Sequence, residues 1–177
     1  MSLTILGIDP GLRTTGWGVI SVDGNRLSHI GDGVIDVPAT GSLAGRLAQL
    51  FSGLEAVLTR YAPEEAAVEE TFVNRNAAST LKLGQARGVT LLAPALAGLE
   101  VHEYSTNLIK KSVVGAGHAD KKQVMMMMRT LLPGATLVKA DAADALAVAV
   151  CHAHHRMSRN RWAEAEKRAG VRAGAGK

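Results

Sequence analysis

The segment Leu3–Ile20, LTILGIDPGLRTTGWGVI, contains a strand, a turn and the start of a second strand. The apolar run Leu3–Ile8 has the length of a buried β-strand, and Asp9-Pro10-Gly11 ends it in a turn. A second strand is predicted at Gly16–Val22, and Arg26–Val37 alternates loosely as a third. Because short turns join these strands, we expect an antiparallel meander.

After the meander, predicted helices alternate with two further short strands. Ser42 can cap a helix in which leucines recur at helical spacing up to Arg60. A helix between the two later strands implies a parallel crossover connection. The sequence therefore predicts an α/β fold with a mixed five-stranded sheet flanked by helices. The later strands are predicted at Ala66–Glu70 and Glu100–Tyr104, and the later helices at Asn76–Leu96, Ser105–Val114, Asp120–Leu132 and Asp141–His155.

The composition is that of one globular domain. The chain has 177 residues, of which 47% are hydrophobic and only 3% aromatic, so Ala, Val and Leu must build the core. A single cysteine, Cys151, allows no internal disulfide and favours a reducing compartment. The N-terminal sequence lacks the features of a signal peptide, and no window has the ~18 uninterrupted apolar residues of a spanning helix. We therefore expect a cytoplasmic protein that does not enter a membrane.

Basic residues gather in the middle and at the end of the chain. Residues 71–140 contain nine basic and three acidic residues, and residues 156–177 contain seven basic and two acidic residues. A basic middle segment suggests a polyanion partner such as nucleic acid, although ordinary scatter of surface charge is the alternative. The basic tail, with Ala and Gly near its end, is expected to be disordered. We accordingly expect a folded domain at 1–155 and a tail at 156–177.

Acidic residues stand at the ends of predicted elements. Asp9 ends one apolar strand, and Glu69 and Glu70 end another. Asp141 and Asp144 share one face of the last helix, where like charges destabilise a helix slightly. The structural alternative is that Asp141 caps this helix while Asp144 interacts with its dipole. Strand alternation puts Glu69 and Glu70 on opposite faces, so periodicity does not choose between them.

Carboxylates from three elements indicate a shared site for divalent cations. Close carboxylates suppress each other's ionisation when no cation neutralises them. Ligand sets made only of oxygen favour Mg²⁺, or Mn²⁺ as a substitute, over zinc. Four carboxylates suit two ions ~3.5–4 Å apart, an arrangement that supports phosphoryl chemistry by activating water and stabilising the leaving oxygen. The sequence therefore predicts two such ions in one active site.

Four segments are similar, in sequence and in order, to the RuvC family of bacterial Holliday junction resolvases. They are ILGIDPGLRTTGWGVI, VEETFVNRNAASTLKLGQARGV, VVGAGHADKKQV and ADAADALAVAV. The resemblance runs from about Leu3 to His155 and does not extend into the tail. It implies a ribonuclease H-like fold and a homodimer that uses Mg²⁺ to cut two opposed strands of a four-way DNA junction symmetrically. It also implies association with the branch-migration motor formed by RuvA and RuvB.

The resemblance assigns the catalytic and metal-binding roles to four acids. Glu69 matches the acid of the family's VE-x-x-F segment, so it is chosen over Glu70. Asp141 and Asp144 match the pair on the last helix, and their mutual repulsion would be relieved by the bound ions. The full predicted set is Asp9, Glu69, Asp141 and Asp144.

The resemblance also implies contacts with DNA. Phe72 matches an aromatic residue that contacts bases near the crossover, although core packing is the structural alternative. Lys110 and Lys121 match basic residues near the scissile phosphate, with solvated helix surface as the alternative. The predicted DNA-binding residues are Phe72, Arg75, Lys110, Lys111, Lys121 and Lys122.

The histidines near the end of the last predicted helix resemble a metal site only superficially. His152, His154 and His155 stand beside Cys151, but no second pair of ligands follows at zinc spacing. We interpret them as polar residues at the end of a helix.

Three other functions fit parts of the sequence. The strand-Asp-x-Gly beginning is shared with sugar kinases and related ATPases, but those enzymes clamp a nucleotide between two such domains. A nuclease of the same fold acting on ribosomal RNA precursors would share the acids, but the Phe72 and lysine segments favour junction DNA. A catalytically inactive DNA-binding module would not need all four acids. The expected function is therefore metal-dependent cleavage of four-way DNA junctions.

Overall fold

The computed structural model describes residues 2–71, 76–137 and 139–174, with side chains as far as residue 159. One sheet contains all five strands in the order β3-β2-β1-β4-β5. β1 and β3 pair with β2 in antiparallel fashion, whereas β1, β4 and β5 are mutually parallel. The predicted meander and mixed five-stranded sheet are therefore confirmed. The strands are β1 (Leu3–Asp9), β2 (Thr14–Asp23), β3 (Arg26–Asp36), β4 (Glu65–Glu69) and β5 (Glu100–Tyr104).

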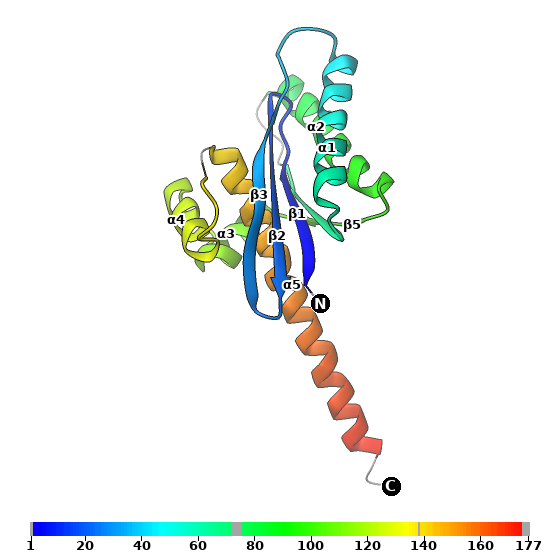
Figure 1. The fold of residues 1–177 in the computed structure, drawn as a ribbon, viewed down its shortest axis with the longest axis vertical. Coiled ribbons are helices and arrows are strands. Elements are labelled where there is room, and N and C mark those ends of the chain that lie inside the picture. Colours follow the sequence, from blue (N-terminus) through cyan, green and yellow to red (C-terminus); the bar gives the residue numbers. More distant parts are fainter. Residues whose placement is uncertain (1, 72–75, 138, 175–177) are drawn as a thin grey trace.

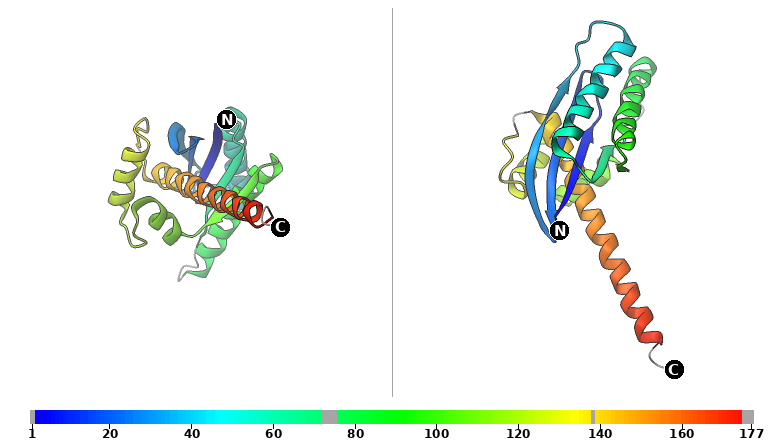
Figure 2. Two further views of the ribbon diagram at one scale, coloured as in Figure 1. Left: turned by 90° about the horizontal axis from the view of Figure 1, so that it is seen from below. Right: turned by 45° about the vertical axis from the view of Figure 1, so that its right-hand side comes forward.

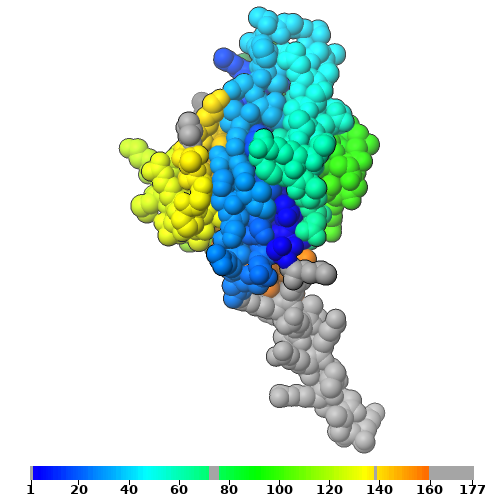
Figure 3. Space-filling view, in the orientation of Figure 1, coloured from blue at the N-terminus to red at the C-terminus, as the bar shows by residue number. Residues whose placement is uncertain are grey.

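Helices cover both faces of the sheet. They are α1 (Leu43–Tyr61), α2 (Ala77–Leu96), α3 (Thr106–Val114), α4 (Lys121–Leu131) and α5 (Ala140–Gly174). One core lies between the sheet and α3, α4 and α5, and the other lies between the sheet and α1 and α2 (Figures 1 and 2). Alternation along β1 places Ile5 in the first core and Leu6 and Ile8 in the second. Figure 3 shows β3 on the surface between α1 and α4.

Glycines on β1 and β2 allow α5 to lie directly against the sheet. A Cβ at Gly16 would be 2.0 Å from the carbonyl oxygen of Asp141, and a Cβ at Gly7 would be 2.2 Å from that of Ala145. A Cβ at Gly18 would meet the Leu146 side chain at 2.6 Å. No larger residue fits without moving the helix, so these glycines set the separation of helix and sheet. The packing holds the first turn of α5 beside the end of β1.

The helix α5 is longer than the sequence analysis predicts. The expected helix end near His155 is wrong, because the helix continues to Gly174 (Figure 1). Residues 156–169 contain neither Gly nor Pro, so no strong stop signal follows His155, and Ala, Glu, Lys and Arg favour continuation. The division into a nuclease domain and a tail stays a prediction. Among the described residues, none of the helices combines the length and apolar character that a membrane span requires.

We expect Gly16→Ala to lower the free energy of unfolding by about 2 kcal/mol or more, because its Cβ must displace the backbone of Asp141. Gly134→Ala is the control, because its Cβ would make only an ordinary contact, 3.6 Å from His29. Urea unfolding followed by circular dichroism measures both variants. Equal unfolding free energies for the two variants would show that α5 can move away from the sheet at little cost.

Candidate active site

Three carboxylates meet in one pocket at the carboxyl ends of β1 and β4. Asp9 is the last residue of β1, and Glu69 is the last residue of the parallel neighbour β4. Asp144 of α5 faces the same pocket, which has a volume of about 220 Å³. Glu69 lines this pocket and Glu70 does not, so the structure makes the choice that strand alternation left open.

Asp141 lies near this pocket without lining it. It is in the first turn of α5, and its negative charge contributes to raising the pKa of Asp9. Because α5 begins at Ala140, Asp141 is inside the helix and is not its N-cap. The capping alternative is therefore wrong, and a role for Asp141 as a metal ligand stays a prediction.

The surroundings of Asp9 disfavour a charged carboxylate. The pKa of Asp9 is raised from 3.8 to about 8, mainly by burial and also by the negative charges of Glu69, Asp144 and Asp141. Burial also raises the pKa of Glu69, although a hydrogen bond from Thr106 opposes the shift. A divalent cation among these oxygens would remove the repulsion, and a donor set of carboxylates fits a hard cation such as Mg²⁺.

Thr106 and two lysines complete the pocket. The Thr106 hydroxyl donates a hydrogen bond of 2.5 Å to Oε1 of Glu69. Lys121 Nζ lies 3.3 Å from Oδ2 of Asp144, and Lys110 lines the same pocket. Both lysines are predicted from the sequence, but Thr106 is not. The signal that could have found Thr106 is the parallel pairing of β4 with β5, because Thr106 follows the carboxyl end of β5 at the same edge of the sheet.

The structure does not bring Lys111 or Lys122 into the carboxylate pocket. Lys111 lines a second cleft, between α3 and α5, and Lys122 is exposed at the start of α4. Phe72 and Arg75 lie outside the described residues. Contacts between these four residues and DNA stay predictions.

The mixed sheet, with acids at the adjacent ends of β1 and β4, defines a nuclease of the ribonuclease H-like class. The chain belongs to the RuvC family, because the family described as "Crossover junction endodeoxyribonuclease RuvC" matches residues 5–152. The resemblance found in the sequence is thereby confirmed.

Relatives from three bacteria match most of the chain. The RuvC protein of Rhodospirillum rubrum is 68% identical over 154 residues, which cover 87% of this chain and 91% of the relative. That of Paramagnetospirillum magneticum is 61% identical over 166 residues, 94% of this chain and 100% of the relative. The solved structure of Thermus thermophilus RuvC in complex with a Holliday junction substrate is similar with a TM-score of 0.82 at 32% identity, covering 88% of this chain and 96% of that one.

The raised pKa of Asp9 makes the stability of the metal-free protein depend on pH. The folded state keeps a proton on Asp9 up to about pH 8, whereas the unfolded chain releases it near the ordinary pKa of 3.8. The folded state binds more protons between these values, so the free energy of unfolding falls as the pH rises through this window. We expect Asp9→Asn to remove much of this decrease in the free energy of unfolding with pH. In EDTA at pH 8, the variant should melt about 4–8 °C above wild type.

Thermal melts in EDTA at pH 5 and pH 8 measure this effect. Asp23→Asn, at the exposed end of β2, is the matched control and should keep the wild-type pH dependence. Adding Mg²⁺ should narrow the gap between wild type and Asp9→Asn, because the cation stabilises the ionised carboxylates. The same pH dependence in Asp9→Asn and wild type would contradict the assignment.

Proposed function

We propose that this chain resolves four-way DNA junctions by paired symmetric nicks, as a metal-dependent endonuclease of recombination and repair. The observation that carries the proposal is the pocket in which Asp9, Glu69 and Asp144 meet two lysines, in a member of the RuvC family. The Thermus thermophilus relative in complex with a Holliday junction substrate supports the choice of DNA. Family membership also supports association with the branch-migration complex of RuvA and RuvB.

The four acids would hold the ions that the reaction requires, two Mg²⁺ per site with Mn²⁺ as a possible substitute. Asp9, Glu69 and Asp144 offer oxygens to the pocket itself, and Asp141 lies one turn away from Asp144. When bound, such ions lower the pKa of water and stabilise the charge that develops on the leaving oxygen. The expected products carry a 5′ phosphate and a 3′ hydroxyl.

Other residues of the pocket orient groups and balance charge. The Thr106 hydroxyl holds Oε1 of Glu69, which fixes the direction of this carboxylate. Lys110 and Lys121 place positive charge at the pocket and so favour the approach of a phosphate. Ile109, Val124 and Ala147 supply the apolar part of its wall.

The remaining basic and aromatic residues would bind the junction around the scissile phosphate. Lys111 and Lys122 would contact the DNA backbone, and Arg75 would do the same beside Phe72. Stacking of Phe72 on an unpaired base could contribute ~1–3 kcal/mol to binding. These roles fit a four-way junction, where bases near the crossover can leave the stack.

Paired cutting requires two active sites, and we propose that α2 joins two copies of the chain. An exposed apolar stripe runs along this helix at a spacing of three to four residues. Leu81, Leu92 and Leu96 are 65%, 52% and 68% exposed, values that are high for leucine side chains. Gly84 and Gly88 lie between them with open space around them, which would let a second backbone approach closely.

We expect Asp9→Asn to reduce cleavage of a synthetic four-way junction by at least ~100-fold in Mg²⁺ or Mn²⁺, because a ligand carboxylate is lost. Junction binding in EDTA should change little, because the fold and the lysines remain. Denaturing gels measure cleavage, and gel shifts measure binding.

Linear duplex DNA and Asp23→Asn serve as the controls for this experiment. Wild type should leave the duplex intact and nick the junction at symmetric positions only when metal is present. Cleavage by Asp9→Asn at the wild-type rate would eliminate the proposed site, and a junction cut no faster than duplex would eliminate the proposed substrate.

We expect Gly84→Arg to convert the dimer to a monomer. A Cβ at Gly84 would have no described neighbour within 4 Å, so the folding of one copy should suffer little, whereas a partner helix would be displaced. Sedimentation velocity measures the oligomeric state. The control is Ala56→Arg, on the exposed side of α1. A dimer that persists in Gly84→Arg would place the interface elsewhere.

A further inference from the structure

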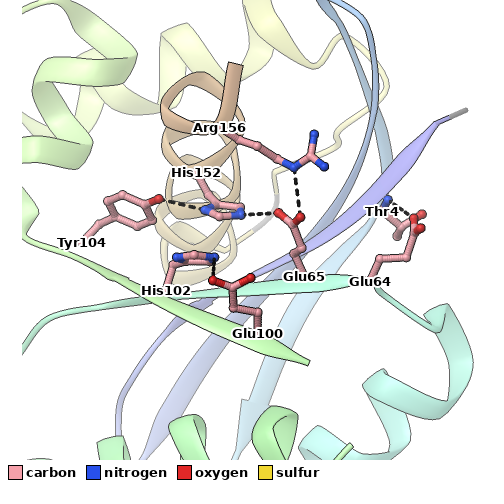
Figure 4. Close-up of polar contacts among 8 residues, drawn as sticks. All are labelled: Thr4, Glu64, Glu65, Glu100, His102, Tyr104, His152 and Arg156. Atoms are coloured by element: carbon pink, nitrogen blue, oxygen red, sulfur yellow. Dashed lines mark hydrogen bonds and ion pairs between the residues drawn. The ribbon is translucent and has the colours of Figure 1, made fainter. Parts of the chain in front are cut away.

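A second polar cluster lies at the opposite end of β4 from the active site. Glu65 begins β4, whereas Glu69 ends it in the carboxylate pocket. Glu65, His102 of β5 and His152 of α5 each offer a ligand atom, and these atoms all lie within 4.8 Å of one another. Figure 4 shows the three side chains converging from three elements. The nuclease reaction described above does not use them.

The His152 side chain is fully buried and has a partner at each ring nitrogen. Nε2 lies 2.7 Å from Oε2 of Glu65, and Nδ1 lies 2.8 Å from the hydroxyl of Tyr104. The ring of His102 stacks on that of His152, with centroids 4.5 Å apart. The two imidazoles and the carboxylate are therefore already gathered at one point by the fold.

The ionisation of the cluster suits metal binding. Burial lowers the pKa of His152 below its ordinary value, although the Glu65 carboxylate opposes the shift. Burial raises the pKa of Glu65, but hydrogen bonds from His152 and Arg156, together with the positive charge of Arg156, bring this pKa below its ordinary value. At neutral pH the pair is thus a neutral imidazole and a carboxylate, which are the forms that coordinate metals.

We propose that Glu65, His102 and His152 bind one transition-metal ion of the Zn²⁺ class, separately from the carboxylate pocket. Two imidazoles and one carboxylate form a ligand set that suits Zn²⁺ and Co²⁺, whereas Mg²⁺ prefers oxygen ligands alone. Water or the Glu100 carboxylate completes the coordination. Oε1 of Glu100 lies 3.3 Å from Nε2 of His102, and its side chain is 75% exposed and free to turn toward an ion.

Neighbouring side chains hold the ligands as outer partners of a metal site do. Arg156 Nε donates to Oε1 of Glu65 at 2.9 Å, which leaves Oε2 for the ion. The Tyr104 hydroxyl holds Nδ1 of His152, which leaves Nε2 for the ion. Both outer partners bind the atom of the ligand that points away from the cluster centre (Figure 4).

Metal binding requires only a small rearrangement. The His152 ring changes to the tautomer protonated at Nδ1, whose N–H donates a hydrogen bond to the Tyr104 oxygen. The ring stays neutral, and Nε2 offers its lone pair to the ion. The distance between Nε2 and Oε2 of Glu65 opens from 2.7 Å to about 3.3 Å, the separation of two ligands in a tetrahedral Zn²⁺ site. The Glu65 and His102 side chains are 18% and 21% exposed, so an ion can enter from solvent.

Co²⁺ is the probe, because its visible absorption distinguishes a four-coordinate site with nitrogen ligands from a six-coordinate site of oxygens. The full-length, untagged protein is titrated with Co²⁺ in excess Mg²⁺, which occupies the carboxylate pocket. Wild type should develop an intense visible band that saturates at one equivalent, and Zn²⁺ should abolish the band by displacement. A wild-type protein that gives no such band would overturn the proposal.

Variants locate the ion. His102→Gln removes a partly exposed ligand and should weaken Zn²⁺ binding at least ~100-fold, whereas the exposed His118→Gln should bind as wild type does. Tyr104→Phe, which removes an outer partner, should weaken binding ~10–100-fold. Equal affinity in wild type and His102→Gln would exclude the site.

Two further measurements keep the proposal testable if a variant folds poorly. Asp9→Asn should keep the Co²⁺ band unchanged, and loss of the band in this variant would assign the ion to the carboxylate pocket instead. A hundredfold excess of free Zn²⁺ over its Kd should raise the melting temperature of wild type by about 5–10 °C and leave that of His102→Gln unchanged. An equal rise in both proteins would contradict the assignment.

Discussion

The contact between α5 and the glycines of β1 and β2 determines where every functional group of this helix lies. Because Gly7 and Gly16 have no Cβ, the backbone of α5 contacts the sheet directly. The carboxylate of Asp144 therefore lines the same pocket as that of Asp9. An ion pair also holds the start of the helix, because Lys139 Nζ lies 2.6 Å from Oδ2 of Asp36 at the end of β3. Farther along, His152 meets the start of β4.

The active site is built at a cost that the rest of the fold must offset. Burying Asp9 beside other acids raises its pKa to about 8, so without a bound cation the charged form of Asp9 is disfavoured. Two apolar cores, one on each face of the sheet, supply the stability that tolerates this local repulsion. A cation bound by these acids would therefore have two effects, because the ion that the proposed reaction requires would also relieve the repulsion among the carboxylates.

The local sequence pattern predicted the helices and strands and the acids at their ends. It could not predict which residues distant in the sequence contact one another. Asp9 and Glu69 followed from apolar strands that end in an acid, and the resemblance chose Glu69 over Glu70. Thr106 was missed because its role depends on the pairing of β4 with β5. The prediction that His152 is a polar residue at the end of a helix was wrong, because its side chain is fully buried within α5 and its partner Glu65 lies 87 residues away in the sequence. Helix periodicity turns residues 152 and 154 in different directions.

Asp144 and His152 lie on the same helix, so the distance and the rotation between their two side chains are fixed by the helix geometry. An insertion or deletion of one residue between them would rotate one end against the other by about 100° and shift it by about 1.5 Å. Neither the acid pocket nor the contact with Glu65 could absorb such a turn while α5 stays on the glycines of the sheet. Evolution can therefore vary side chains between these two residues, but the number of residues there is fixed, and changes of length must fall in the loops.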